Sequence, residues 1–392
     1  MASPETIDAS ASDWRAAGFG VYVHWPFCLA KCPYCDFNSH VSRTVDHAAW
    51  ADALLEEARH MRSLTGPRAA DTVFFGGGTP SLMPPATVAR VITQIDRLWG
   101  LAPGAEITLE ANPTSVEAAK FRDYAAAGVN RLSMGVQALN DADLKALGRT
   151  HTAAEARAAF DIAREAFNRV SFDLIYARRD QTVPEWEREL QEALSMAIDH
   201  LSLYQLTIEP GTRFGELADL GRRLNAPDER AAEMFEVTQA LTENAGMPAY
   251  EISNHARPGA ESRHNLIYWR YGDYAGIGPG AHGRITAGGR TGTATRRDPA
   301  DWLETVGMDG HAIEETETLT PEDQAAEYLM MSLRLREGSD MSRYRTLSGA
   351  AVSEARVAAL VSSGHLIRSG NRLIATDRGR ITLNTVLMEL MH

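Results

Sequence analysis

Short apolar runs rich in β-branched and aromatic residues alternate with longer segments of helical period over most of this 392-residue chain. Strands joined by helical crossovers run parallel, so this alternation predicts an α/β fold, either a barrel or an open doubly wound sheet. Pro103-Gly104 marks the turn into the third strand. The predicted strands are Gly20–Phe27, Thr72–Phe75, Glu106–Glu110, Arg131–Val136, Val170–Tyr176 and His200–Thr207. The predicted helices between them are Asp46–Met61, Ala86–Trp99, Val116–Ala127, Ala153–Phe167 and Pro184–Ala197.

The pattern is looser after Pro210, where a helix over Asp228–Asn244 precedes an aromatic and glycine-rich segment, Tyr250–Gly289. Two helices and a small β-hairpin near the C-terminus then predict an α+β, winged-helix-like domain. Its predicted elements are the helices Ala325–Leu335 and Ser353–Ser363, the strands His365–Arg368 and Arg372–Ala375, and a last helix within Thr376–Leu390. We expect four parts: a polar tail (1–17), a core (18–210), a barrel extension (211–320) and the C-terminal domain (321–392).

Charge and hydropathy exclude several classes of protein. The formal net charge is −13, from 39 basic and 52 acidic residues, which argues against a nucleic acid as the main partner. The first 17 residues lack the basic and apolar regions of a signal peptide, and no apolar stretch is long enough to span a bilayer. We therefore expect a cytoplasmic protein.

The three cysteines of the chain lie together as Cys28-x3-Cys32-x2-Cys35. A disulfide framework would need spread and usually even-numbered cysteines, so this cluster indicates a metal or redox site in a reducing compartment. Thiolates are the usual ligands of iron–sulfur clusters, and this spacing lets three sulfurs of one loop face three corners of a cubane. With no fourth cysteine available, one iron keeps an open coordination position. The motif predicts a 4Fe–4S cluster that binds a small molecule at this iron.

Three other interpretations of the cysteines are weaker. A zinc site would take its fourth ligand from His24 or His40, but structural zinc sites usually pair two Cys-x-x-Cys knuckles and the chain has no second one. A redox dithiol leaves the third cysteine unexplained. Three buried cysteines of no function would leave their clustering to chance.

Glycines, or polar residues whose side chains could bind a ligand or take part in catalysis, follow six of the predicted strands. In parallel α/β folds, functional sites assemble at the carboxyl ends of strands, so we expect these positions to meet on one face. The positions are Cys28, Gly76–Thr79, Glu110–Asn112, Gln137, Asp173 and Thr207.

The segment from Tyr22 through Cys28 to Phe37 resembles the cluster loop of radical S-adenosylmethionine (SAM) proteins of the coproporphyrinogen dehydrogenase group. The resemblance implies a partial (β/α)6 barrel whose cluster binds the amino and carboxylate groups of SAM. One loop departs from the family: Ala177–Asp180 is charged where a Gly-Leu-Pro-Gly stretch is common, which puts its path and any substrate contact in doubt. Matching positions imply SAM contacts by Tyr22, Tyr34, Gly77, Gly78, Thr79, Glu110, Gln137, Arg149 and Asp173.

Two features separate the chain from the dehydrogenases. Those enzymes carry a further cysteine two residues after the last cluster cysteine, where this chain has Phe37, and they have a longer extension than the 27 residues before Cys28. Both features resemble the HemW heme chaperones. A third is the His-Asn-x-x-Tyr-Trp motif typical of that group, formed here by His264, Asn265, Tyr268 and Trp269.

The resemblance implies that these four residues contact heme. If the segment is helical, His264 and Tyr268 share a face. The structural alternative is a capped segment in which the histidine and tryptophan stabilise the edge of the barrel.

The function implied by the resemblance is heme transfer to acceptor hemoproteins, including membrane-bound respiratory enzymes, with peripheral contact to the inner membrane. The alternative is an oxygen-independent coproporphyrinogen III dehydrogenase that makes protoporphyrinogen IX by radical chemistry on SAM. The sequence favours the chaperone and leaves enzyme activity open.

Overall fold

The computed structural model of the protein describes residues 9–391. Seven strands form the parallel part of its main sheet, and four more strands extend the two edges. The parallel strands are β1 (Phe19–Trp25), β4 (Ala70–Gly77), β5 (Leu101–Ala111), β6 (Arg131–Gln137), β7 (Arg169–Tyr176), β8 (His200–Gln205) and β10 (Asp273–Ile277). The edge strands are β9 (Asn254–Ala256), β11 (His282–Thr286), β12 (Arg290–Thr295) and β13 (Ile313–Thr318).

The strand order is β13-β12-β11-β10-β1-β4-β5-β6-β7-β8-β9, and the two end strands do not pair with each other. The barrel is therefore partial, as expected. All six predicted strands are present. Among the parallel strands, the one that was not predicted is β10, which pairs with β1 from Phe19↔Asp273 to Val23↔Ile277. The antiparallel edge strands β9, β11, β12 and β13 were not predicted either. Pro103-Gly104 does not precede β5 but lies within it, where the pairing with β4 shifts register and Gly104 has a φ of +70°.

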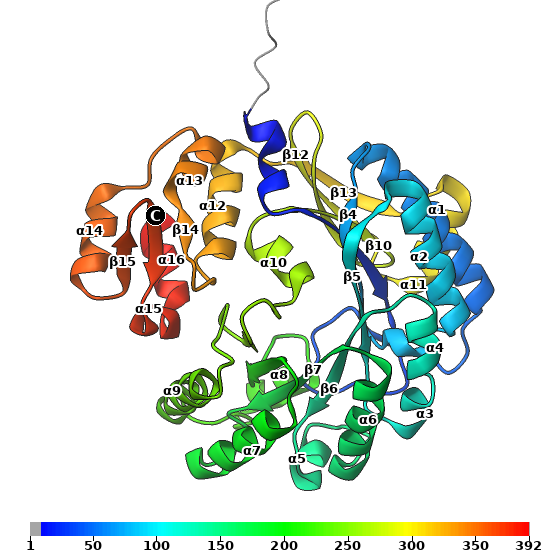
Figure 1. Cartoon of the computed structure of the whole chain (residues 1–392), viewed down its shortest axis with the longest axis horizontal. Helices are drawn as coiled ribbons and strands as arrows, with labels where there is room; N and C mark the ends of the chain where they lie inside the picture. Colours follow the sequence, from blue (N-terminus) through cyan, green and yellow to red (C-terminus); the bar gives the residue numbers. More distant parts are fainter. Residues whose placement is uncertain (1–8, 392) are drawn as a thin grey trace, which may run out of the picture.

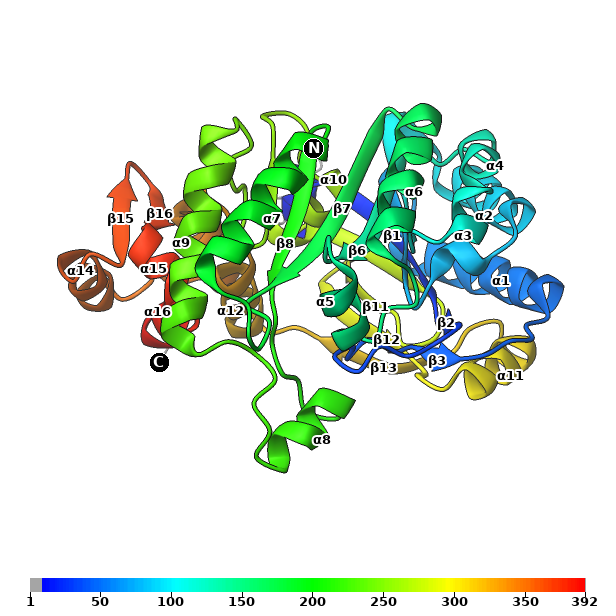
Figure 2. The same cartoon turned by 90° about the horizontal axis from the view of Figure 1, so that it is seen from below.

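Helices cover the outer face of the sheet (Figures 1 and 2). In α2 (Pro85–Trp99) the buried residues Val88, Val91 and Ile95 recur at helical spacing, which gives this helix one apolar face for the sheet. The predicted helix Val116–Ala127 is two short helices separated at Ala119. The helices of this part are η1 (Ala9–Ala16), α1 (His47–Thr65), η2 (Pro80–Leu82), α2 (Pro85–Trp99), α3 (Ser115–Ala118), α4 (Phe121–Ala126), α5 (Asp141–Ala146), α6 (Ala153–Ala166), α7 (Val183–Met196), α8 (Arg213–Asp219), α9 (Asp228–Asn244), α10 (Arg263–Trp269) and α11 (Pro299–Asp309).

One buried carboxyl group fastens α1 to the far end of the sheet. Glu57 accepts hydrogen bonds from the backbone N–H groups of Gly278 (2.7 Å) and Ala312 (3.0 Å) and from Trp302 Nε1 (3.1 Å). Trp302, on α11, also stacks on Trp50 of α1 at 5.0 Å between ring centroids. These contacts fix the turn between β10 and β11, which lies beside the site described below.

The C-terminal domain has a small hydrophobic core of its own, and its antiparallel strands β15 and β16 confirm the predicted hairpin. The predicted last helix is interrupted at Thr382. Figure 1 shows the domain in orange and red, next to α10. Its elements are α12 (Pro321–Ser332), β14 (Ser339–Asp340), α13 (Met341–Ser348), α14 (Glu354–Ser362), β15 (Leu366–Ser369), β16 (Arg372–Ala375), α15 (Asp377–Ile381) and α16 (Leu383–Met391).

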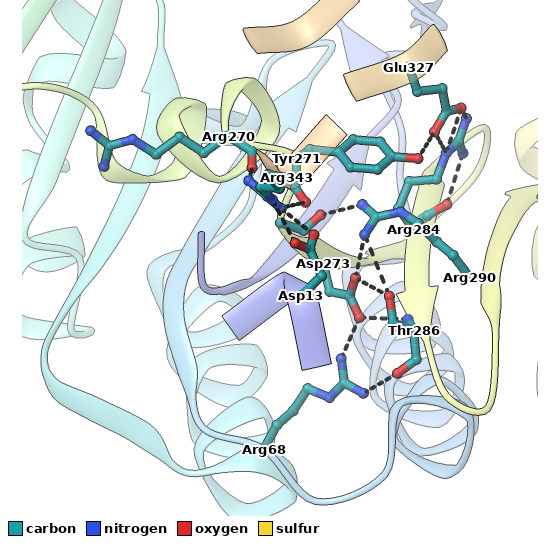
Figure 3. A network of polar contacts seen from close by, with 12 residues as sticks. Asp13, Arg68, Arg270, Tyr271, Asp273, Arg284, Thr286, Arg290, Glu327 and Arg343 are labelled. Carbon is teal, nitrogen blue, oxygen red and sulfur yellow. Dashed lines mark hydrogen bonds and ion pairs between the residues drawn. The ribbon is translucent and has the colours of Figure 1, made fainter. Parts of the chain in front are cut away.

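An arginine joins the C-terminal domain to η1 and to the residues that directly follow α10. Arg343 of α13 pairs with Asp13 of η1 at 2.6 Å and donates to the backbone carbonyls of Arg270 and Tyr271 (Figure 3). Residues 1–8 of the expected polar tail lie outside the described residues, whereas the rest of it forms η1 and the turn into β1. In the range 9–391, no helix combines the length and apolarity needed to cross a membrane.

Candidate functional site

The three cysteines lie in one loop that is closed at its base by a short pair of strands. Strand β2 (Phe27–Cys28) pairs in parallel with β3 (His40–Val41), so the loop between them leaves and returns at the same place. Cys28, Cys32 and Cys35 all line a cavity of about 150 Å³ at the carboxyl ends of the parallel strands. The loop thus brings three thiols to the expected edge of the sheet.

The surroundings of the thiols suit a cluster. Thr79 donates to the Cys28 sulfur at 3.4 Å, and Arg149 Nη1 donates to the Cys32 sulfur at 3.4 Å. Partial burial raises the pKa of Cys28 and of Cys35, and a bound metal ion would favour their thiolate forms. Since each cysteine of a cubane binds a different iron, the three sulfurs need not meet at one ion.

The geometry does not favour the zinc interpretation. Within the described part of the chain, no three His, Cys, Asp or Glu side chains converge on a single ion position. Both histidines that were candidates for a fourth ligand are bonded to Asn38 instead. His24 Nε2 lies 2.8 Å from the Asn38 carbonyl oxygen, and His40 Nε2 lies 3.1 Å from Asn38 Oδ1.

The predicted SAM contacts come together around the cysteines. With the exception of Tyr22, every one of them lines the same cavity as the three thiols. Tyr22 lines a neighbouring cavity, described below, that shares Gly77 and Glu110 with the first. The residues of the smaller cavity that were predicted as SAM contacts are Tyr34, Gly77, Gly78, Thr79, Glu110, Gln137, Arg149 and Asp173.

Backbone conformations at the strand ends open the smaller cavity. Gly77 has a φ of +111°, and a Cβ there would lie 2.6 Å from the His24 ring, so only glycine fits. Gln137, at the end of β6, has a φ of +71°, which is uncommon for a residue with a side chain. Such a conformation at the end of a strand is often found at functional sites.

Arg149 is held in place before any ligand binds. Its Nη2 donates to Asn112 Oδ1 at 2.5 Å and to the Gly135 carbonyl at 2.8 Å. Asn112 in turn donates to Thr79 Oγ1 at 3.2 Å. Asn112 was not predicted as a contact, although it follows Glu110 at the same strand end. Its link between Arg149 and Thr79 makes it part of the site.

Two carboxyl groups face the cavity with raised pKa values. Burial, and then the neighbouring Asp173 charge, raises the pKa of Glu110 to about 8. Burial also raises the pKa of Asp173 to about 6, although Arg131 and Arg149 oppose this shift. A ligand that brings positive charge next to these groups therefore favours their ionised forms.

A larger cavity of about 510 Å³ adjoins the first, within the size range of small-molecule sites. Phe37, Gly77 and Glu110 line both cavities. Arginines form part of the wall, and Figure 3 shows Arg284 paired with Glu327 of α12. The aromatic and charged side chains of its lining include Tyr22, His24, Phe37, Tyr268, Trp269, Tyr274, His282, Arg284, Arg290, Arg297 and Glu327.

The segment with the His-Asn-x-x-Tyr-Trp motif is α10, and the structure divides its residues. Tyr268 and Trp269 line the larger cavity, whereas His264 and Asn265 do not. His264 is buried, and its two ring nitrogens lie 2.6 Å from Thr72 Oγ1 and 2.7 Å from the Tyr268 hydroxyl. Burial lowers the pKa of His264 to about 3, so the ring is neutral. Contact of His264 with heme stays a prediction.

The charged loop after β7 is anchored away from both cavities. The Arg178 side chain is buried and pairs with Glu189 of α7 and, at 2.9 Å, with Asp143 of α5. Ala177 has a φ of +58°, which turns the chain towards these partners. Arg178 to Gln181 line a separate cavity between α5, α7 and α8.

Comparison with known proteins gives the family. Residues 22–193 match the radical SAM superfamily, and residues 319–381 match the HemN C-terminal domain. The chain is 37% identical to the heme chaperone HemW of Escherichia coli K12, over 94% of this chain and 96% of that protein. It belongs to the HemW family of radical SAM proteins.

Other relatives are about as similar to the chain. Identity is 34% to the heme chaperone HemW of Bacillus subtilis, over 93% of this chain and 97% of that protein. It is 40% to the mitochondrial radical S-adenosyl methionine domain-containing protein 1 of Bos taurus, over 95% and 87%. The radical SAM enzyme coproporphyrinogen III oxidase (HemN) of Escherichia coli has the same fold, with a TM-score of 0.80 at 23% identity over 99% of this chain and 93% of that one.

Proposed function

We propose that the chain binds a 4Fe–4S cluster and SAM in the smaller cavity and heme in the larger one, and that it delivers heme to acceptor hemoproteins. The observation that carries this proposal is the wall common to the two cavities, formed by Phe37, Gly77 and Glu110. A porphyrin in the larger cavity would lie directly against the SAM site. Relatives that match nearly the whole chain are named heme chaperones.

The lining of the larger cavity suits a flat, apolar ligand with acidic edges. Tyr268 and Trp269 offer aromatic surface, and Phe37 is 60% exposed at the boundary between the cavities. Arginine side chains provide the paired donors that carboxylates bind. Heme has both properties: an apolar macrocycle and two propionate groups.

In the smaller cavity, Cys28, Cys32 and Cys35 would each hold one iron of the cluster. The cluster supplies an open iron position for the amino and carboxylate groups of SAM. The backbone at Gly77 gives the ligand close access, and the Glu110 carboxylate would accept hydrogen bonds from its donors. Arg149 is fixed by Asn112 and would contribute positive charge near the SAM carboxylate.

We place this activity in the cytoplasm, with acceptors that include membrane-bound respiratory enzymes reached by peripheral contact. The C-terminal domain would supply the docking surface for the acceptor. The net charge of −13 argues against nucleic acid as an alternative partner for this domain.

The test is reconstitution of the cluster under anaerobic conditions, followed by two parallel assays. One sample receives heme and is then mixed with an apo-hemoprotein; the other receives coproporphyrinogen III, SAM and reductant. We expect stable heme binding, transfer to the acceptor, and weaker binding in Trp269→Ala. Robust formation of protoporphyrinogen IX would instead identify the dehydrogenase. Equal iron and sulfide contents are expected from a 4Fe–4S cluster, and zinc without sulfide would overturn the cluster assignment.

A further inference from the structure

Arginines of the larger cavity differ in whether they already have an acidic partner. Arg284 pairs with Glu327 at 2.8 Å, and Arg290 pairs with Asp273 at 3.2 Å (Figure 3). Arg297 lines the same cavity and is exposed, and it forms no ion pair within residues 9–391. Arg297 is therefore the cavity arginine that is free to receive a carboxylate from a ligand.

Histidines near this cavity also differ in whether their ring nitrogens already have hydrogen-bond partners. His24 is engaged at both ring nitrogens, by the Tyr22 hydroxyl at 3.0 Å and the Asn38 carbonyl at 2.8 Å. His264 is engaged at both nitrogens as well and lies outside the lining. His282 lines the cavity and is exposed, and its ring has no hydrogen-bond partner among the described residues. A histidine must have such a free nitrogen to bind a metal.

The position of His282 follows from the strand that carries it. His282 and Arg284 are two residues apart on β11, so their side chains stand on the same face of the sheet, and both line the cavity. On the neighbouring strand, a Cβ at Gly276 would lie 2.1 Å from the His282 carbonyl oxygen, so glycine is required for this close approach. The turn before β11 is fixed by the bond from Gly278 to Glu57.

The His282 imidazole is also in the right protonation state. Partial burial, and then the positive charges of Arg284 and Arg297, lower the pKa of His282, while Glu315 opposes the shift. The lowered pKa favours the neutral imidazole, which is the form that coordinates metals.

We propose that His282 is the axial ligand of the heme iron and that Arg297 binds a heme propionate. This inference rests on the proposed heme-binding function and assigns the two residues that would fix the orientation of the macrocycle. Tyr268 and Trp269 of α10 line the same cavity and would offer aromatic surface to the macrocycle.

The test is a titration of the cluster-reconstituted protein with ferric hemin, followed by its absorption and electron paramagnetic resonance spectra. We expect His282→Ala to bind hemin at least about tenfold more weakly, with a shifted Soret band, as expected when a metal ligand is lost. Added imidazole should restore the wild-type spectrum in this variant. The matched control is His365→Ala, at a histidine of the C-terminal domain that lines neither cavity, and this variant should keep the wild-type Soret position.

Arg297 is tested with hemin and hemin dimethyl ester as paired probes. Arg297→Ala should lose about tenfold in affinity for hemin and little for the ester, because only hemin has carboxylates to pair. Arg296→Ala, at a neighbouring residue that contacts Glu314, is the control and should change neither affinity. Equal losses for both probes in Arg297→Ala would overturn the carboxylate assignment.

Failure of this assignment can be told from failure of the proposed function. A wild-type protein that takes up no hemin would refute heme binding altogether. Uptake by the wild type together with an unchanged spectrum in His282→Ala would refute only the assignment of His282. Cluster content and thermal unfolding of each variant show whether the fold is kept, and Arg297→Ala tests the site without depending on the folding of His282→Ala.

Discussion

Replacing Glu57 with glutamine measures how strongly one buried carboxyl group makes the stability of the fold depend on pH. The side chain is completely buried and accepts three hydrogen bonds, from Gly278, Ala312 and Trp302. Burial raises its pKa from 4.5 to about 7, although these three donors favour the charged form. The folded protein therefore binds this proton more tightly than the unfolded chain does.

The size of the effect follows from the shift. A shift from 4.5 to about 7 corresponds to about 3 kcal/mol at 1.36 kcal/mol per pH unit. Because the folded-state pKa is raised, this contribution is fully present below pH 4.5 and is lost as the pH rises to about 7. Above that pH the carboxylate is charged in both states, and the free energy of unfolding no longer depends on this group.

Urea unfolding at several pH values between 4.5 and 8 is the assay. Glutamine does not titrate, so the difference in unfolding free energy between the wild type and Glu57→Gln should change by about 3 kcal/mol over this range. Glu56→Gln is the control, because the Glu56 side chain is half exposed on the same helix. The reasoning is wrong if the difference for Glu57→Gln stays constant with pH, or if Glu56→Gln changes it equally.

Three further outcomes are expected. SAM should bind more tightly as the pH rises from 6 to 8, by up to about tenfold per unit, because Glu110 with its pKa of about 8 must lose a proton next to a cationic ligand; calorimetry on Glu110→Gln should show no such dependence. Gly77→Ala should abolish SAM binding but keep the iron content, because its Cβ would meet the His24 ring at 2.6 Å. Arg343→Ala should lower the unfolding free energy by about 2 kcal/mol through loss of the Asp13 pair, and an unchanged melting temperature would count against that contact.

Strands with strong local signals could be predicted, and those made by tertiary pairing could not. The six predicted strands are runs rich in β-branched and aromatic residues that alternate with predicted helices. Strand β10 is short and contains Asp273 and Gly276, and it becomes a strand because β1 lies beside it. Helix α13 escaped prediction for a related reason: Met341–Ser348 is mostly polar and buries only Leu347.

At the functional site, too, features that depend on tertiary contacts could not be predicted from the sequence. The first cysteine and several of the SAM residues follow strands of the parallel sheet, so their meeting on one face could be predicted from the strand pattern. Tyr22, Tyr34 and Arg149 do not follow a strand and were predicted from the family resemblance. His282 and Arg297 lie on or just after antiparallel edge strands, where no such rule applies. Spacing correctly placed His264 and Tyr268 on one helix face, but the bond from His264 to Thr72 depends on a strand almost 200 residues earlier.

The pairing of β1 between β4 and β10 has a consequence for synthesis of the chain. One edge of β1 finds its partner about 50 residues later, but the other waits for residues 273–277, about 250 residues later. Long-range parallel pairing is slow, and an open strand edge is prone to aggregation until it is covered. The cysteine loop follows β1 directly and bonds through Asn38 to Pro279, just beyond β10. Although it leaves the ribosome early, this loop reaches its final form only when most of the protein has been translated.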